Sequence, residues 1–286
     1  MNGGALLYSY RIDSATIGQF VRRLEERGAS PGTAEKYRRD IRRFSGWLQG
    51  GPATQGSALR WRDSLLAEGC RHTTVNSMLA AVNAFFRFMG WDIRVGFLRV
   101  QKKVFCDPRR ELTRPDYFRL LETAGKLKKE RLALLLETIC STGIRVSEVR
   151  YITAEAARAG KAEISLKGKT RTILLPGKLC RKLLRYAKQQ KTASGEIFLT
   201  KSGKSLSRKQ IWAEMKALCR KAGVEAGKVF PHNLRHLFAR TFYEASRDVV
   251  KLSDVLGHSS IETTRIYLIS TGAEHRRLLE GMPLLL

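Results

Sequence analysis

Helical periodicity along most of its length is the feature that most restricts how this chain can fold. From residue 13 to residue 90, apolar side chains recur every three or four positions, which places them on one face of successive helices. The pattern predicts four short amphipathic helices, with Ser14 or Thr16 capping the first. Residues 91–110 break the pattern with a glycine, a proline and two pairs of basic residues. We therefore expect a helical bundle followed by a linker.

Helical patterns return after the linker, with one short exception. Residues 162–175 alternate in the manner of strands around Lys167-Gly168-Lys169, which predicts a β-hairpin. The expected fold class is mainly α with a small β-sheet (α+β), in which an N-terminal helical bundle precedes a mixed α/β domain. The predicted boundaries are 12–92 for the bundle, 93–110 for the linker and 111–286 for the second domain.

The charge of the chain indicates its partner. The net charge is +27, from 53 Lys+Arg against 26 Asp+Glu, and the basic residues are spread along the whole chain. Basic membrane-surface and ribosomal proteins instead concentrate such residues in tails or amphipathic helices. Basic side chains that bind phosphates release condensed counterions, so a nucleic acid is the expected partner.

Several other classes of protein are disfavoured by composition. The five cysteines are far apart and form no CxxC pair, which argues against a zinc or redox motif. No signal peptide is evident, and no apolar run approaches the roughly 20 residues that span a bilayer. We expect a cytoplasmic protein with reduced thiols, no membrane partner, no metal and no cofactor.

Five segments of the second half carry residues suited to phosphate chemistry. A helix is expected to end at Gly143, so that Arg145 can point into a cleft at the start of the next turn. Lys167, at the tip of the hairpin, can reach a DNA groove or act as an acid. Taken singly, Arg145 is more often a surface arginine at a helix start, and Lys167 is more often part of a charged turn.

The remaining three segments lie nearer the C-terminus. His232 and Arg235 are three residues apart on a helix that opens with a proline, so they share a face and can cradle a phosphate. His258 follows a glycine in a turn between two helices, and Tyr267 comes nine residues later. On its own, a tyrosine in a helix usually packs in the core or on the surface.

Taken together and in this order, the segments resemble the tyrosine recombinase (phage integrase) family. The family pattern is an arginine within TG[IL]RxSE, a lysine on a β-hairpin, HxLRH, LGH and then a tyrosine. Residues 110–280 resemble it strongly, and the bundle at 13–90 looks like the family's core-DNA-binding (SAM-like) domain. The resemblance implies a catalytic domain of the DNA breaking-rejoining type. Within the family, the short stretch before the first expected helix leaves no room for a separate arm-binding domain, so we expect a simple integrase or Xer-type resolvase.

The resemblance implies a role for each matching residue. Tyr267 would be the nucleophile that attacks the scissile phosphodiester and forms a 3′-phosphotyrosyl link. A free tyrosine has a pKa of about 10, so this step requires assistance at neutral pH. Arg145 and Arg235 would clamp the non-bridging oxygens, and His232 would accept the tyrosyl proton. His258 would bind a phosphate oxygen.

The hairpin lysine is the least constrained of these assignments. Lys167 would protonate the leaving 5′-oxygen, because the family's catalytic lysine commonly precedes a glycine. Lys169 lies two residues further along the strand and emerges on the same face, so it remains an alternative. Since the energy of the broken bond is held in the phosphotyrosyl link, ligation would require no ATP. No metal ion is implied, because the two arginines can do the electrostatic work often given to Mg²⁺.

Two other functions share features with this pattern. Type IB topoisomerases use the same arginine, lysine, histidine and tyrosine chemistry to relax DNA, and a non-catalytic DNA-binding protein would also be basic and helical. A recombinase is expected to act on double-stranded DNA as a homotetramer on two recombination sites, in DNA integration or the recombination of a mobile element. The apolar end at 284–286 is a candidate for docking into a neighbouring protomer.

Overall fold

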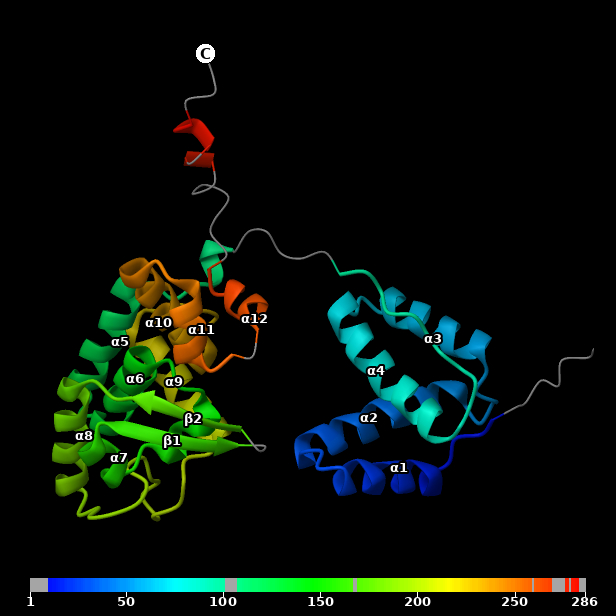
Figure 1. Cartoon of the computed structure of the whole chain (residues 1–286), viewed down its shortest axis with the longest axis horizontal. Coiled ribbons are helices and arrows are strands. Elements are labelled where there is room, and N and C mark those ends of the chain that lie inside the picture. The colour runs from blue at the N-terminus through cyan, green and yellow to red at the C-terminus, as the bar shows by residue number, and fades with distance from the viewer. Residues whose placement is uncertain are drawn as a thin grey trace, which may run out of the picture. The chain divides into compact units, whose positions relative to one another are not determined.

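The computed structural model describes residues 10–100, 107–166, 169–258, 260–268, 276–277 and 279–282. The chain divides into two compact units, one ending at Lys102 and the other beginning at Lys103. Both are mainly helical, and the second contains a two-stranded sheet (Figure 1), so the predicted α+β class is confirmed. No helix in the described part of the chain is both long enough and apolar enough to cross a membrane.

The first unit is a bundle of four helices, as the periodicity predicts. They are α1 (Ser14–Glu26), α2 (Pro31–Leu48), α3 (Gln55–Ala67) and α4 (His72–Phe88). Their apolar faces enclose an aromatic core, in which the Phe44 ring lies 4.9 Å from Trp61 and 5.8 Å from Phe86. The first helix is capped by Asp13, whose carboxylate accepts the Thr16 N–H at 2.8 Å. The cap is thus Asp13, and neither Ser14 nor Thr16 is the cap residue.

The chain after α4 stays on the first unit. Val95 is buried in its core, and the Asn83 amide donates to the Val95 carbonyl at 2.8 Å and accepts its N–H at 3.0 Å. Asn76 makes the same pair of bonds to Leu98, both at 2.8 Å. An extended segment with no partner strand leaves its backbone groups unpaired, and the two amides satisfy them. The first residues of the predicted 93–110 linker therefore pack as part of the first unit.

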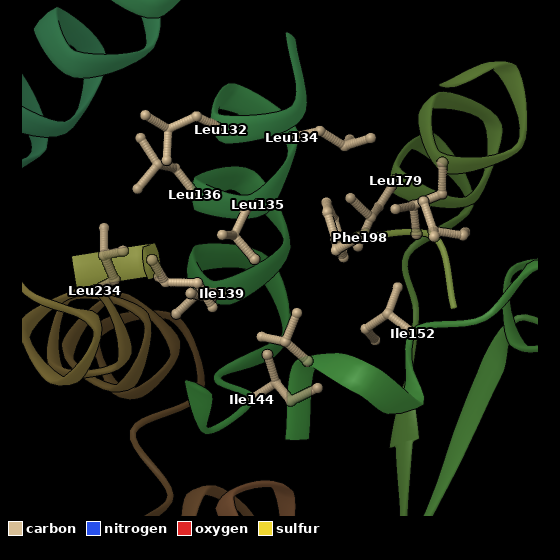
Figure 2. Close-up of a cluster of buried hydrophobic side chains, with 14 of the residues drawn as sticks. Leu132, Leu134, Leu135, Leu136, Ile139, Ile144, Ile152, Leu179, Phe198 and Leu234 are labelled. Carbon is tan, nitrogen blue, oxygen red and sulfur yellow. The ribbon is translucent and has the colours of Figure 1, made fainter. Parts of the chain in front are cut away.

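The second unit is built around the central helix α6 (Glu130–Thr142). Figure 2 shows leucines of α6 and Ile139 extending toward apolar side chains from several other segments. The other elements are η1 (Pro108–Arg110), α5 (Arg114–Lys126), η2 (Val146–Tyr151), α7 (Ala154–Ala159), β1 (Lys161–Leu166), β2 (Lys169–Leu174), α8 (Gly177–Gln189), α9 (Arg208–Ala222), α10 (Pro231–Ser246), α11 (Val249–Leu256) and α12 (Ile261–Arg265).

The end of α6 requires a glycine. Gly143 has a φ of +64°, and a Cβ at this position would overlap the ring of Phe238. The turn that it makes buries Ile144 in the core and leaves the Arg145 side chain 40% exposed. The predicted helix end is therefore correct, and it places Arg145 at the surface of the unit.

The predicted hairpin is also present. Strands β1 and β2 pair antiparallel, with Ile164 opposite Arg171. Residues 167–168 lie outside the described part of the chain, and with them the predicted acid Lys167. The apolar end at 284–286 lies outside it as well.

Candidate active site

Arg235 is the most connected residue of the site. It comes from α10, it is only 2% exposed, and its guanidinium donates to the carbonyl of Gly143, at the end of α6. It also donates to the Leu256 carbonyl at 2.9 Å, at the end of α11. These bonds explain why a charged group is tolerated in so buried a place, because each gives a partner to an N–H that can no longer bond to water.

His258 lies against Arg235 in the turn after α11. Its Nε2 is 2.9 Å from Nη2 of Arg235, and its Nδ1 is 2.8 Å from Oγ1 of Thr264. A guanidinium can only donate, so Nε2 of His258 must accept, and Nδ1–H then donates to the threonine. The turn thus holds His258 as a neutral imidazole of one defined tautomer.

Tyr267 is enclosed by the same group of residues. Its side chain is 4% exposed, and its hydroxyl accepts a hydrogen bond from Nε of Arg235 at 3.3 Å. The rings of three histidines surround it, with centroid distances of 5.7 Å to His232, 4.3 Å to His236 and 5.6 Å to His258. Tyr267 therefore lies within the site of its own chain and in contact with a cation.

Arg145 is held at the edge of the site by Glu148. Its N–H donates to Oε2 of Glu148 at 2.9 Å, and its guanidinium donates to Oε1 at 3.1 Å. The carboxylate is 3% exposed, whereas the arginine side chain is 40% exposed. A buried carboxylate thus orients a guanidinium that keeps free donors toward solvent.

These side chains border one cavity of about 430 Å³. Its walls include Arg145, His232, Arg235 and Tyr267, together with Arg208 and Trp212 of α9. Four of the six predicted site residues thus line one hollow, and His258 adjoins it through Arg235. The hollow is basic and partly aromatic, which suits a phosphate and the nucleotide attached to it.

Besides Arg208 and Trp212, sequence reasoning did not single out Glu148, His236 or Arg171, whose guanidinium donates to Glu148. Glu148 follows Arg145 by three positions, the spacing at which a side chain bonds back to a helix start. Arg171 belongs to strand β2, in the hairpin on which the catalytic lysine was predicted. His236 lies one turn after His232, and their Nε2 atoms are 3.2 Å apart. Local spacing was therefore a signal for Glu148 and His236, but not for Arg171.

The histidines of the site favour their neutral forms. Burial lowers the pKa of His236 to about 4, with smaller contributions from His232 and the Arg235 guanidinium. Burial and the nearby arginines, Arg235 first, lower the pKa of His258 to about 4. Desolvation, Arg235 and Arg145 lower the pKa of His232 as well. A site with this much positive charge resists further protonation.

We expect the stability of the chain to fall as the pH is lowered from about 6.5 to about 4. Because the pKa of His236 is about 4 in the folded chain and about 6.5 in an unfolded one, only the unfolded chain binds this proton in that range. His236 alone contributes roughly 1–2 kcal/mol to the loss between pH 7 and pH 5. Denaturant unfolding at both pH values measures it. His236→Asn should lose less than wild type, and equal losses would contradict the expectation.

Comparison with known proteins identifies the family. Residues 110–274 match the phage integrase family, and residues 17–92 match the phage integrase N-terminal SAM-like domain. This chain belongs to the phage integrase family. Tyrosine recombinase XerA of Pyrococcus furiosus is 31% identical over 282 residues, which covers 96% of both chains. Tyrosine recombinase XerD of Brucella suis is 30% identical over 285 residues, which covers 89% of this chain and 92% of that protein.

Solved structures share the fold of the chain. XerH bound to a difH substrate before cleavage has a TM-score of 0.67 at 18% identity, covering 96% of this chain and 91% of that one. A lambda integrase in a tetramer bound to a Holliday junction has a TM-score of 0.69 at 17% identity, covering 88% and 76%. These structures share the fold, and the family match together with the curated relatives confirms the predicted family. The relatives support a tyrosine-type site-specific recombinase, and neither topoisomerase activity nor purely architectural DNA binding is favoured.

Proposed function

We propose that Tyr267 cleaves DNA by attacking the scissile phosphodiester, which forms a 3′-phosphotyrosyl link and releases a 5′-hydroxyl. The observation that carries this proposal is the hydrogen bond of 3.3 Å from Nε of Arg235 to the Tyr267 hydroxyl. It puts a nucleophile and a phosphate-binding cation side by side in one chain. A donor on the hydroxyl oxygen stabilises the phenolate that must form in the attack.

Arg145 and Arg235 form the proposed phosphate clamp. They line the same cavity as Tyr267, one from the turn after α6 and the other from α10. Two guanidiniums can bind the non-bridging oxygens and offset the negative charge that develops in the pentacoordinate transition state. Resealing reverses the attack, with a 5′-hydroxyl displacing the tyrosine, so the proposed reaction consumes no ATP.

The proton transfers are assigned to the remaining residues. His232 is proposed to accept the Tyr267 proton, in line with its unprotonated ring at neutral pH. Lys167 is proposed to protonate the leaving 5′-oxygen, and Lys169 is the alternative. His258 accepts from Arg235 in the free chain, so to donate to a phosphate oxygen it must first gain a proton, which an arriving phosphate anion favours.

We propose that four protomers act on two double-stranded recombination sites. Exchange of all four strands requires four tyrosines, and each chain carries one Tyr267 beside its own clamp. The lambda integrase structure, described as a tetramer bound to a Holliday junction, supports this stoichiometry by analogy. XerH, described as bound to a difH substrate, supports duplex DNA as the partner.

A nicked suicide substrate tests the proposed function. Because the released fragment diffuses away, the wild-type chain is expected to accumulate as a covalent protein–DNA adduct without added ATP. Tyr267→Phe is expected to form none, although it should bind the same DNA. The absence of an adduct in the wild type would refute the proposal. Rapid relaxation of supercoiled plasmid lacking a recombination site would favour topoisomerase activity instead.

A further inference from the structure

A third arginine, Arg171 of strand β2, lies behind the two clamp residues. Its Nη2 donates to Oε2 of Glu148, and its Nη1 donates to the carbonyl of Leu256. The side chain is 16% exposed. It is therefore directed into the protein and away from the surface where other basic residues of this chain lie.

Both acceptors of Arg171 are shared with the clamp. The Glu148 carboxylate also binds the guanidinium of Arg145 at 3.1 Å. The Leu256 carbonyl also binds the guanidinium of Arg235 at 2.9 Å. Arg171 is thus linked to each clamp arginine through one intermediary, and it joins segments that are 23 and 85 residues away from it in the sequence.

The packing around Arg171 leaves it little freedom to move. A Cβ on Gly257 would lie 2.5 Å from Cδ and 2.7 Å from Nη1 of Arg171, so the arginine rests directly on the backbone of this glycine. Gly257 has a φ of +61° and precedes His258. The side chain therefore also braces the turn that presents His258 to Arg235.

We propose that Arg171 is a positioning residue that holds Arg145 and Arg235 at the spacing required to clamp one phosphate. This inference rests on the proposed function. Without Arg171, Oε2 of the buried Glu148 loses a charged partner and competes more strongly for Arg145. At the same time, the Leu256 carbonyl loses one of its two arginine donors, and the turn at Gly257 loses the side chain that packs against it. Arg171 itself does not line the cavity, so its effect passes through the two arginines that do.

The test compares three scissile groups in otherwise identical suicide substrates. Arg171→Ala is expected to slow cleavage of the natural phosphodiester by about 10- to 100-fold. On a methylphosphonate, which lacks one charged oxygen and so depends less on the clamp, the defect should shrink to a few-fold at most. On a 5′-bridging phosphorothiolate, whose thiolate leaves without a proton, the full defect should remain.

Each possible pattern of defects on the three substrates either supports or overturns the proposed role of Arg171. An equal defect on all three substrates means a general structural role and overturns the proposal, as does the absence of any defect. Rescue by the phosphorothiolate would show that Arg171 acts on protonation of the leaving group and would also overturn it. If wild type itself forms no adduct, the proposed function fails first.

Two further variants control for folding. Arg171→Lys keeps the charge but cannot reach both acceptors, so it should show a smaller defect with the same dependence on the substrate. Lys161→Ala removes an exposed ion pair with Glu163 from the same hairpin and should cleave all three substrates as wild type does. If Arg171→Ala does not fold, as judged by its thermal melting, Arg171→Lys decides by the same criterion.

Discussion

Replacing Arg235 with alanine is expected to lower the rate of DNA cleavage by at least about 10²- to 10³-fold, because it removes a preorganised donor from the transition state. The same change leaves the Gly143 carbonyl without a charged donor, removes one of the two arginines bonded to the Leu256 carbonyl, and frees the Tyr267 hydroxyl. It therefore acts on the phosphate, on the nucleophile and on the geometry of the site together. Cleavage of a suicide substrate under single-turnover conditions measures it.

Affinity for DNA separates this catalytic loss from a loss of binding. Many phosphate contacts share the binding energy on a chain of charge +27, so Arg235→Ala should bind its DNA within a few-fold of wild type. Arg235→Lys keeps the charge but lacks the fork of donors, and it should remain strongly impaired. Arg158→Ala, which removes a 55% exposed arginine of α7, should cleave normally. A cleavage rate of Arg235→Ala equal to that of wild type would contradict the proposed phosphate clamp.

The second large effect is on stability. Gly143→Ala is expected to reduce the free energy of unfolding by about 2–4 kcal/mol, from the strain of a positive φ and the overlap of the new methyl group with Phe238. Since the Gly143 carbonyl also binds Arg235, cleavage should fall as well. Denaturant unfolding gives the stability, and cleavage measured well below the midpoint gives the second effect.

Gly160 supplies the matched control for this substitution. It ends α7 with a φ of +70°, but nothing lies within 4 Å of a Cβ built there. Gly160→Ala should therefore cost only the strain of the backbone, about 1–2 kcal/mol, and leave cleavage unchanged. If the two alanine variants were equally stable, the close packing of Gly143 against Phe238 would be refuted.

Much of the fold was predictable because its signals are local. The apolar spacing in 13–90 predicts the bundle, and the alternation around residue 167 predicts the hairpin. The cap of α1 was misplaced by one to three residues, since Asp13 and Thr16 bond to each other and only the geometry shows which is the cap. The path of the chain beyond α4 depends on two asparagines of that helix, which the sequence does not distinguish from other polar residues.

For the candidate site, sequence motifs predicted which residues would lie together more readily than the hydrogen bonds that link them. Arg145 lies at the start of a helical turn, Arg235 belongs to an ordered motif, and His258 follows a glycine. The fold brings the three together. Arg171 escapes such reasoning, because its partner Leu256 is 85 residues away and is a backbone carbonyl, which no sequence motif marks. Contacts like those of Arg171, which hold other site residues in place, are determined by packing between distant segments.

We expect Tyr267 to become covalently joined to DNA during cleavage. The most direct measurement is to trap the wild-type chain on a suicide substrate, digest it with protease and identify by mass spectrometry the peptide that carries the nucleotide. The expected result is a single phosphotyrosyl link at Tyr267, which is absent from Tyr267→Phe and unaffected in Tyr243→Phe. A link to any other residue, or an adduct that persists in Tyr267→Phe, would contradict it.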